Sequence, residues 1–515
     1  MNRHNITYLL VYAVLMLSLS SCKKWLDLKP ESEIILDDFW QSESQANSVV
    51  AGCYKALTSD DCMSRMVLWG EGRSDNVGYL DTDDKDLKRI VGFDISATNG
   101  YCKYASFYSV INYCNTFLYY APNVMNVDPN FTLADLHGLQ AEVLTIRSLA
   151  YFYLVRAFKN VPWINKPSTS DQQNFYVSQS PEHEVLDSLV SNLKTALLYA
   201  PTTYGTVESN KGRVTKNTVL ALLADIYLWN MQYDNCVQMC DQIMSDKNLE
   251  LTNGQSTLYS VFYKGNSSES IFELQFGETD QNKQYNNIVK NYYGNYDDVL
   301  AQLSFSSFLA SGTKSPFNLK VGSTVESEKD IRLQDFVYMA YGKNTGIYPI
   351  FKYAGVDRTE NIDGTSSSYF YRSNSANWIV YRLSDIILMK AEALVQLNRG
   401  QEAINMVNLT YMRSNANDVD SLDIKNYPSK DVLEKLVLRE RQRELLFEGK
   451  RWFDLMRRAR RVGTVTPLLE FVSEKLGDGS GNQVNSNSIM DALYLPINKS
   501  ELDANPELKQ NPYYN

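Results

Sequence analysis

The chain has 515 residues, of which 50 are basic and 60 acidic, giving a formal net charge of −10 at pH 7. This length predicts two to four domains or one large composite domain. The acidic balance excludes binding to nucleic acid, whose phosphates require a basic surface, and it also excludes charge-driven binding to anionic lipid.

The first 22 residues have the composition of an export signal. Arg3 precedes an apolar stretch, Tyr8–Leu19, and two serines separate that stretch from Cys22. The stretch is too short to cross a hydrocarbon core of ~30 Å, and small residues directly before a cysteine resemble a bacterial lipobox. We therefore expect a lipoprotein signal peptide over residues 1–21 and lipidation of Cys22. The alternative is an ordinary signal peptide that ends near a cysteine.

After Asp135, apolar residues return every three or four positions, which predicts helices. The expected helices span residues 139–157, 183–198, 215–229 and 233–244. The last two are joined by a very short turn and resemble a tetratricopeptide unit, in which small side chains let two antiparallel helices approach closely. A second such unit is expected much later, with helices over 381–397 and 402–412. One helical-repeat scaffold interrupted by an insertion accounts for both units.

The residues between the two units differ in composition. Residues 248–377 are rich in Gly, Ser, Asn and Tyr, and 270–276 alternate in polarity, so we expect loops, short strands and a few brief helices. Long irregular segments inside compact domains are usually functional or disordered, and the aromatic density here favours function, so we place the ligand face in this insertion. The predicted division is a signal peptide (1–21), an N-terminal helical region (22–247), the loop-rich insertion (248–377) and a C-terminal region that completes the scaffold (378–515).

Residues 432–461 carry the highest density of charge. Glu440, Glu444 and Glu448 recur every four residues among arginines, a spacing that builds i,i+4 pairs worth about 0.2–0.5 kcal/mol each. A nucleic-acid-binding helix would need basic residues without neighbouring acids. We interpret the segment as a structural helix with an apolar stripe.

Several motifs follow one another along the chain. The most specific runs through the charged segment: Arg443-Glu444-Leu445, then Phe447-Glu448-Gly449-Lys450-Arg451-Trp452-Phe453-Asp454-Leu455. The others are Cys22–Pro30, Ala141–Pro162, Arg382–Ala393, Leu493–Ile497 and Asn505–Pro512. Together, and in this order, they resemble the SusD/RagB family, the surface lipoproteins of nutrient-uptake systems in Bacteroidota.

The resemblance implies a mainly α fold, with a tetratricopeptide-like scaffold and a variable, loop-rich face. It also implies a cell-surface lipoprotein of the outer membrane that captures oligosaccharides and acts as a hinged lid on a SusC-like TonB-dependent barrel. A peptide-binding lid is known within the same resemblance, and the sequence does not separate sugar from peptide.

Two segments combine aromatic rings, which cover the apolar faces of sugars, with polar groups for the hydroxyls. The first supplies the candidate ligand residues Trp69, Arg73, Asp75, Asn76 and Tyr79, and the second supplies Tyr292, Tyr293 and Tyr296. In relatives of the family the ligand-binding aromatics come from loops in roughly these regions. The alternative for each tyrosine is packing in the core or at an interface.

Catalytic and metal-binding motifs are absent from the sequence. It contains no Gly-x-Ser-x-Gly elbow, phosphate loop, His-Glu-x-x-His motif or zinc-spaced Cys/His cluster. Acid pairs such as Asp297-Asp298 are interpreted as solvated loop residues, so glycoside hydrolysis is a minor alternative to a binding protein without cofactor or metal. An exported protein could oxidise some of its cysteines, but we favour buried free thiols for Cys53, Cys62, Cys102 and Cys114.

Overall fold

The computed structural model describes most of the chain from Phe39 onward. The described ranges are 39–80, 83–169, 173–279, 282–294, 301–310, 315–317, 320–321, 324–325, 330–353, 356–359, 368–371, 375–415, 420–476, 484 and 488–515. Cys22 and Tyr296, a predicted lipidation site and a predicted ligand residue, lie outside these ranges.

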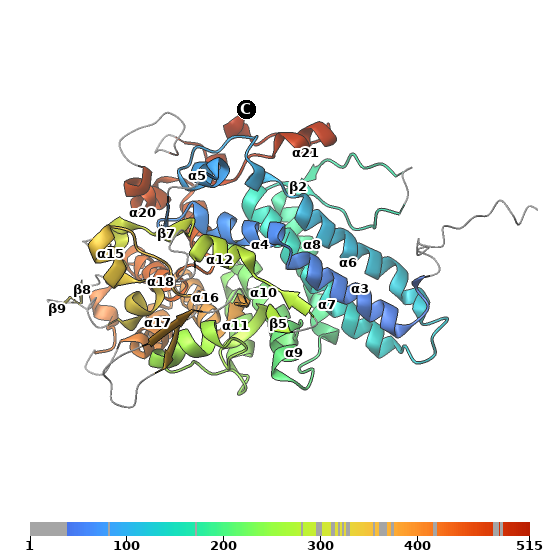
Figure 1. The fold of residues 1–515 in the computed structure, drawn as a ribbon, viewed down its shortest axis with the longest axis horizontal. Coiled ribbons are helices and arrows are strands. Elements are labelled where there is room, and N and C mark those ends of the chain that lie inside the picture. Colours follow the sequence, from blue (N-terminus) through green and yellow to red (C-terminus); the bar gives the residue numbers. More distant parts are fainter. Residues whose placement is uncertain are drawn as a thin grey trace, which may run out of the picture.

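A continuous stack of helices forms the scaffold (Figure 1). Each helix of the stack packs against the next, and α18 also packs against α16. The contact between α11 and α16 joins the two predicted repeat units across the insertion, so the mainly α repeat scaffold is confirmed. The stacked helices are α6 (Ala105–Val124), α7 (Leu133–Phe158), α8 (Glu182–Tyr199), α10 (Lys216–Trp229), α11 (Tyr233–Met244), α16 (Leu383–Gln396), α17 (Gly400–Ser414) and α18 (Lys430–Glu444).

Local sequence explains where these helices begin and end. Helix α7 starts at a capping box in which the Thr132 and Asp135 side chains each accept a hydrogen bond from the other residue's backbone amide, an arrangement that satisfies two amides otherwise left unpaired. The turn between α10 and α11 passes through Met231 at φ 58°. The expected helices agree with the observed ones to within a few residues, apart from α7, which begins six residues earlier than expected.

The helices that precede α7, including α6, were not predicted. Helices α3 (Glu43–Leu57) and α4 (Asp60–Val67) are capped by Ser42 and Ser59, whose hydroxyls accept from backbone amides in the first turn. Helix α3 packs along α6 and α7 and buries Val50 and Cys53.

The described strands are short and form two-stranded antiparallel sheets. Strand β4 lies in the predicted alternating segment and pairs with β12, so the insertion is joined directly to the start of the C-terminal region. The pairs are β1 (Val77–Tyr79) with β7 (Leu303–Phe305), β2 (Val161–Pro162) with β3 (Gln179–Ser180), β4 (Ser270–Leu274) with β12 (Trp378–Arg382), β5 (Gly277–Thr279) with β6 (Asn282–Gln284), β8 (Lys320–Val321) with β9 (Thr324–Val325), and β10 (Val356–Thr359) with β11 (Ser368–Tyr371).

Shorter helices surround the scaffold. Figure 1 shows α5, α20 and α21 along one edge, with α12 and α15 beside them over the left half of the molecule. Their bounds are α5 (Lys85–Val91), α9 (Val207–Gly212), α12 (Asn287–Tyr293), α13 (Ser307–Ala310), α14 (Ile331–Phe336), α15 (Met339–Thr345), α19 (Arg451–Val462), α20 (Thr466–Leu476) and α21 (Lys499–Ala504), with the π-helices η2 (Leu68–Gly72) and η5 (Leu258–Tyr263) and the 3₁₀ turns η3 (Gly100–Cys102), η4 (Gly254–Ser256), η7 (Ile424–Asn426), η8 (Met490–Leu493) and η9 (Pro512–Tyr514).

The charged segment differs from the prediction in two ways. It forms two helices, α18 and α19, because the chain turns between them with Phe447 at φ 65° and Gly449 at φ 68°. Its glutamates are buried and do not form a surface ladder: Glu444 receives hydrogen bonds from arginines on three distant segments, Arg332, Arg382 and Arg413. These cations keep the pKa of Glu444 well below its usual value despite burial.

Together these groups form what we call the buried ion cluster. Its five acids, Asp330, Glu269, Glu440, Glu444 and Glu448, face five cations, Arg332, Lys352, Arg382, Arg413 and Arg443. Equal numbers of opposite charges let the cluster be buried without a net charge, which would otherwise carry a large desolvation cost.

Two further expectations concern the membrane and the cysteines. Among the described helices, none is long and apolar enough to cross a membrane. All six cysteines in the described ranges are free and buried, which confirms the preferred interpretation of the N-terminal four.

Candidate functional site

The fold brings the two predicted ligand segments together. Strand β1 pairs with β7, so that Tyr79 lies opposite Leu303. The backbone of Gln302 links both segments: its carbonyl accepts from the amide of Leu80 at 3.0 Å, and its amide donates to the carbonyl of Asn291 at 2.9 Å. Helices α12, α5 and α20 lie on the same side of the molecule (Figure 1).

The motif over Arg443–Leu455, which we call the signature, holds this part of the chain in place. Gly70 in η2 lies so close to Gly449 that a Cβ added at Gly70 would be 1.7 Å from the carbonyl oxygen of Gly449. The hydroxyl of Tyr293 donates to the carbonyl of Phe447 at 2.9 Å. Both predicted segments are therefore packed against the turn between α18 and α19, and a π-helix such as η2 is a frequent feature of functional regions.

This packing corrects the prediction for Trp69 and Arg73. The Trp69 ring is 1 % exposed, stacks on Phe107 with a centroid separation of 5.0 Å, and donates from Nε1 to the carbonyl of Tyr101. The Arg73 guanidinium is also buried; it lies over the Trp452 ring and donates to the carbonyl of Leu493. Burial lowers the pKa of Arg73 to about 10. Neither side chain presents a surface to a ligand.

Asp75 and Asn76 are corrected in the same way. Asp75 forms a buried ion pair with Arg451 at 2.8 Å, and both Asp75 and Asn76 accept hydrogen bonds from the Gln442 amide. These polar groups fix the loop between η2 and β1 to helix α18, where sequence composition alone had suggested ligand contacts.

Two ionisable groups support this loop from either side. Asn76 donates to Glu71, whose burial raises its carboxyl pKa to about 7. From α20, the ammonium of Lys475 donates to the carbonyls of Gly72 and Ser74, and burial lowers the pKa of Lys475 to about 7.

Two tyrosines of the second segment, Tyr292 and Tyr293, are packing residues. Tyr292 is 2 % exposed and Tyr293 1 % exposed, and the Tyr293 ring stacks on Tyr353. Burial and the neighbouring Tyr101 raise the pKa of Tyr292. The packing alternative therefore holds for these two residues, and Tyr296 stays a prediction because it lies outside the described ranges.

Tyr79 is the predicted ligand residue that remains accessible within the described chain. Its ring is 40 % exposed, and the ammonium of Lys88 lies 5.1 Å from the ring centroid. Asp84 accepts from the hydroxyl of Tyr101 at 2.6 Å, and this hydrogen bond together with burial raises the pKa of Tyr101 to about 12. We call the surface formed by Tyr79, Asp84, Lys88 and Gln302 the Tyr79 face.

The sequence did not indicate the cavities of the structure. One of about 490 Å³ lies between the end of α7, strand β3 and the last 25 residues, and it is lined by Lys159, Asp491 and Lys509 among others. These positions are brought together only by the tertiary fold. Within the described ranges, no group of three or more His, Cys, Asp or Glu side chains is placed to hold a metal ion.

The stack of helices with its loop-rich face defines the chain as a helical-repeat protein. Two family models divide its length: one for the SusD family matches residues 232–514, and one described as starch-binding, associating with the outer membrane, matches residues 24–228. The chain belongs to the SusD family.

Similar proteins agree with this assignment. The chain is 26 % identical to SusD-like protein P38 of Formosa agariphila, with 99 % of each chain aligned, and 23 % identical to SusD-like protein P2 of the same organism, with 98 % and 99 % aligned. Among solved structures, it resembles a SusD homolog from Bacteroides thetaiotaomicron with a TM-score of 0.73 and 19 % identity, covering 93 % of this chain and 100 % of that one. It also resembles a putative sugar binding protein from Bacteroides vulgatus with a TM-score of 0.68 and 23 % identity, covering 92 % and 99 %.

Proposed function

We propose that this protein is a cell-surface lipoprotein that captures oligosaccharides and acts as a lid on a SusC-like TonB-dependent transporter of the outer membrane. One of the matching family models is described as starch-binding, and neither description names a catalytic activity. Anchoring by a lipid on Cys22 would keep such a lid near its transporter, which raises its effective concentration there.

The single observation that carries the ligand assignment is the accessible ring of Tyr79. It stands at the junction of both predicted segments, with the Lys88 ammonium close to it. An exposed ring covers the apolar face of a sugar, and adjacent charged and amide groups bind hydroxyls. Because most of the other candidates are buried, we place the ligand on the Tyr79 face.

The test is isothermal titration calorimetry of the mature protein against a panel of plant, host and microbial oligosaccharides. Tyr79→Ala should weaken binding of the identified glycan at least tenfold without changing the thermal midpoint. Tyr259→Ala is the matched control, because Tyr259 is 45 % exposed on η5, outside the Tyr79 face. Undiminished affinity in Tyr79→Ala would reject the site.

The same samples separate the alternatives. New reducing ends after incubation would identify a glycoside hydrolase, and retention of mixed peptides in place of sugars would identify a peptide-binding lid. For the anchor, Cys22→Ala should move the protein from the membrane fraction to the soluble fraction. A variant that stays with the membrane would contradict lipid anchoring at Cys22.

A further inference from the structure

The cavity of about 490 Å³ contains an unusual backbone conformation at Lys159. Lys159 follows α7 with φ 68° and ψ −78°, and the amide of Asn160 donates to the carbonyl of Phe158 at 2.9 Å. This is a γ-turn with a positive central φ, a form that is rare and strained for any residue except glycine.

Fold stability does not account for a lysine at this position. Its ammonium pairs with Asp491 at 2.7 Å, but the side chains are 41 % and 24 % exposed, and ion pairs as exposed as this one stabilise a fold little. Glycine would adopt the same turn without strain. Strained residues that persist in this way concentrate at ligand sites. The strain at Lys159 therefore indicates that the cavity it lines is a ligand site.

The charged groups of the cavity balance one another. Lys159 and Lys509 face Asp491 and Glu507, and the remaining polar lining is hydroxyl, amide and backbone. A lining without net charge that contains both donors and acceptors matches a neutral ligand whose groups both donate and accept. Sugar hydroxyls have this property, and the volume lies within the usual 300–1,000 Å³ of small-molecule sites.

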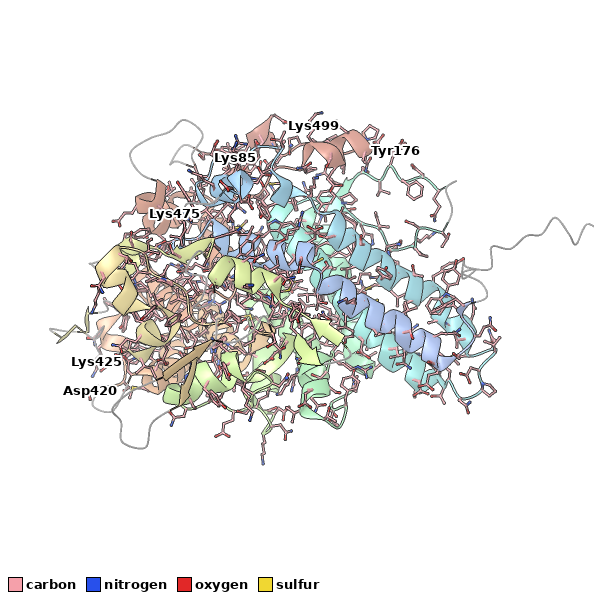
Figure 2. The ribbon with its side chains drawn as sticks, in the orientation of Figure 1. Lys85, Tyr176, Asp420, Lys425, Lys475 and Lys499 are labelled. Carbon is pink, nitrogen blue, oxygen red and sulfur yellow. The ribbon has the colours of Figure 1, made fainter. Side chains whose placement is uncertain are left out.

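Two exposed aromatic residues directly precede a segment that lines the cavity. Phe175 is 52 % and Tyr176 55 % exposed, and they precede the lining residue Ser178 by three and two positions. The loop that carries them is held by the Asn505 amide, which donates to the carbonyl of Val177 at 2.9 Å. Figure 2 shows Tyr176 at the edge of the molecule, well separated from Lys85 of α5, which adjoins Asp84 of the Tyr79 face.

We propose that this cavity is a second carbohydrate site, in which Phe175 or Tyr176 covers the face of a neutral sugar ring and Lys159, Asp491, Glu507 and Lys509 bind its hydroxyls. It shares no residue with the Tyr79 face. Its ligand class rests on the proposed function, since both sites would take parts of the imported glycan.

The central experiment compares Lys159→Gly with wild type in calorimetric titrations against neutral oligosaccharides, covering α-glucans, β-glucans, mannans, xylans and fructans. Wild type should show two binding events for at least one of them. Lys159→Gly should lose one event, with affinity at that site falling at least tenfold, while the thermal midpoint is unchanged or raised. Met231→Gly is the control, because it relieves a positive φ of 58° outside the cavity and should retain both events.

A double variant, Phe175→Ala with Tyr176→Ala, carries the test if Lys159→Gly does not fold, because both residues are on the surface. It should lose the same event as Lys159→Gly, whereas Tyr79→Ala should lose the other. Two events in the double variant, or a single event that only Tyr79→Ala removes, would overturn the second site and leave the proposed function standing. Binding of dipeptides at the cavity without sugars would overturn its ligand class, and failure of wild type to bind any of the glycans would overturn both proposals.

Discussion

Replacing Arg382 with methionine tests how strongly the buried ion cluster stabilises the scaffold. The guanidinium is fully buried, and it contacts Glu269 at 2.5 Å, Glu444 at 2.7 Å and Glu448 at 2.8 Å. Methionine keeps much of the length but removes the charge, which leaves five buried acids facing four cations. Breaking a buried pair by removing one partner costs about 3–5 kcal/mol, because the remaining charge stays desolvated.

The expected change in Tm is this free-energy cost divided by the entropy of unfolding, which grows with chain length. Unfolding entropy is about 2.1 cal/mol/K per residue, so a chain of about 500 residues unfolds with about 1 kcal/mol/K, and Arg382→Met should lower Tm by about 3–5 °C. Circular dichroism melting, supported by urea titration, measures the shift. Arg399→Met is the matched control, since Arg399 pairs with Glu402 on the surface at 43 % and 52 % exposure, and its Tm should stay within about 1 °C. If the two variants had the same Tm, the buried ion cluster would not contribute to stability by the proposed amount.

Three further predictions follow from other parts of the fold. Gly70→Ala places a Cβ 1.7 Å from the carbonyl oxygen of Gly449 and should destabilise the fold by about 3 kcal/mol or more, whereas Gly138→Ala, with nothing within 4 Å, should be neutral or stabilising in urea titrations. Lys450 and Arg441 lower the pKa of Asp385 to about 2. The ionised carboxylate therefore contributes about 2 kcal/mol to the free energy of unfolding above pH ~4, and this contribution is lost between pH ~4 and ~2. Asp385→Asn should flatten the pH dependence of unfolding in that window, and an unchanged slope would contradict the assignment. A thiol reagent should label none of the buried cysteines before denaturant is added, with mass spectrometry checking Cys53, Cys62, Cys102, Cys114, Cys236 and Cys240.

The helical scaffold could be predicted because its information is local. The 3.6-residue pattern placed α10 and α11 nearly to the residue. The partners of the charged segment could not be predicted from spacing. Glu444 stands four residues from Glu440 and Glu448, but its arginine partners come from as far away as Arg332, and no local pattern records such a pairing.

For the same reason, the sequence could not show which candidate ligand residues would be buried. Composition singled out the Trp69–Tyr79 segment, yet it could not show which side of the backbone each side chain would occupy. Trp69 entered the core, while Tyr79, at the end of β1, stayed exposed. The cavity at Lys159 could not be predicted from the sequence, because its lining residues are far apart in the chain. Gln179 and Lys509 are 330 positions apart, and the backbone amide of Lys509 donates a hydrogen bond to the amide oxygen of Gln179.

The signature that identifies the family therefore has a positioning role. Gly449 and Phe447 form the turn against which Gly70 and Tyr293 pack, and the signature carboxylates are neutralised inside the protein. Such residues constrain the scaffold and carry no information about what it binds. On our proposals, ligand specificity then resides in side chains outside the signature, at Tyr79 and in the rim and lining of the Lys159 cavity. Exchanging these exposed residues between relatives should change the glycan bound without changing stability, whereas changes within the signature should change stability first.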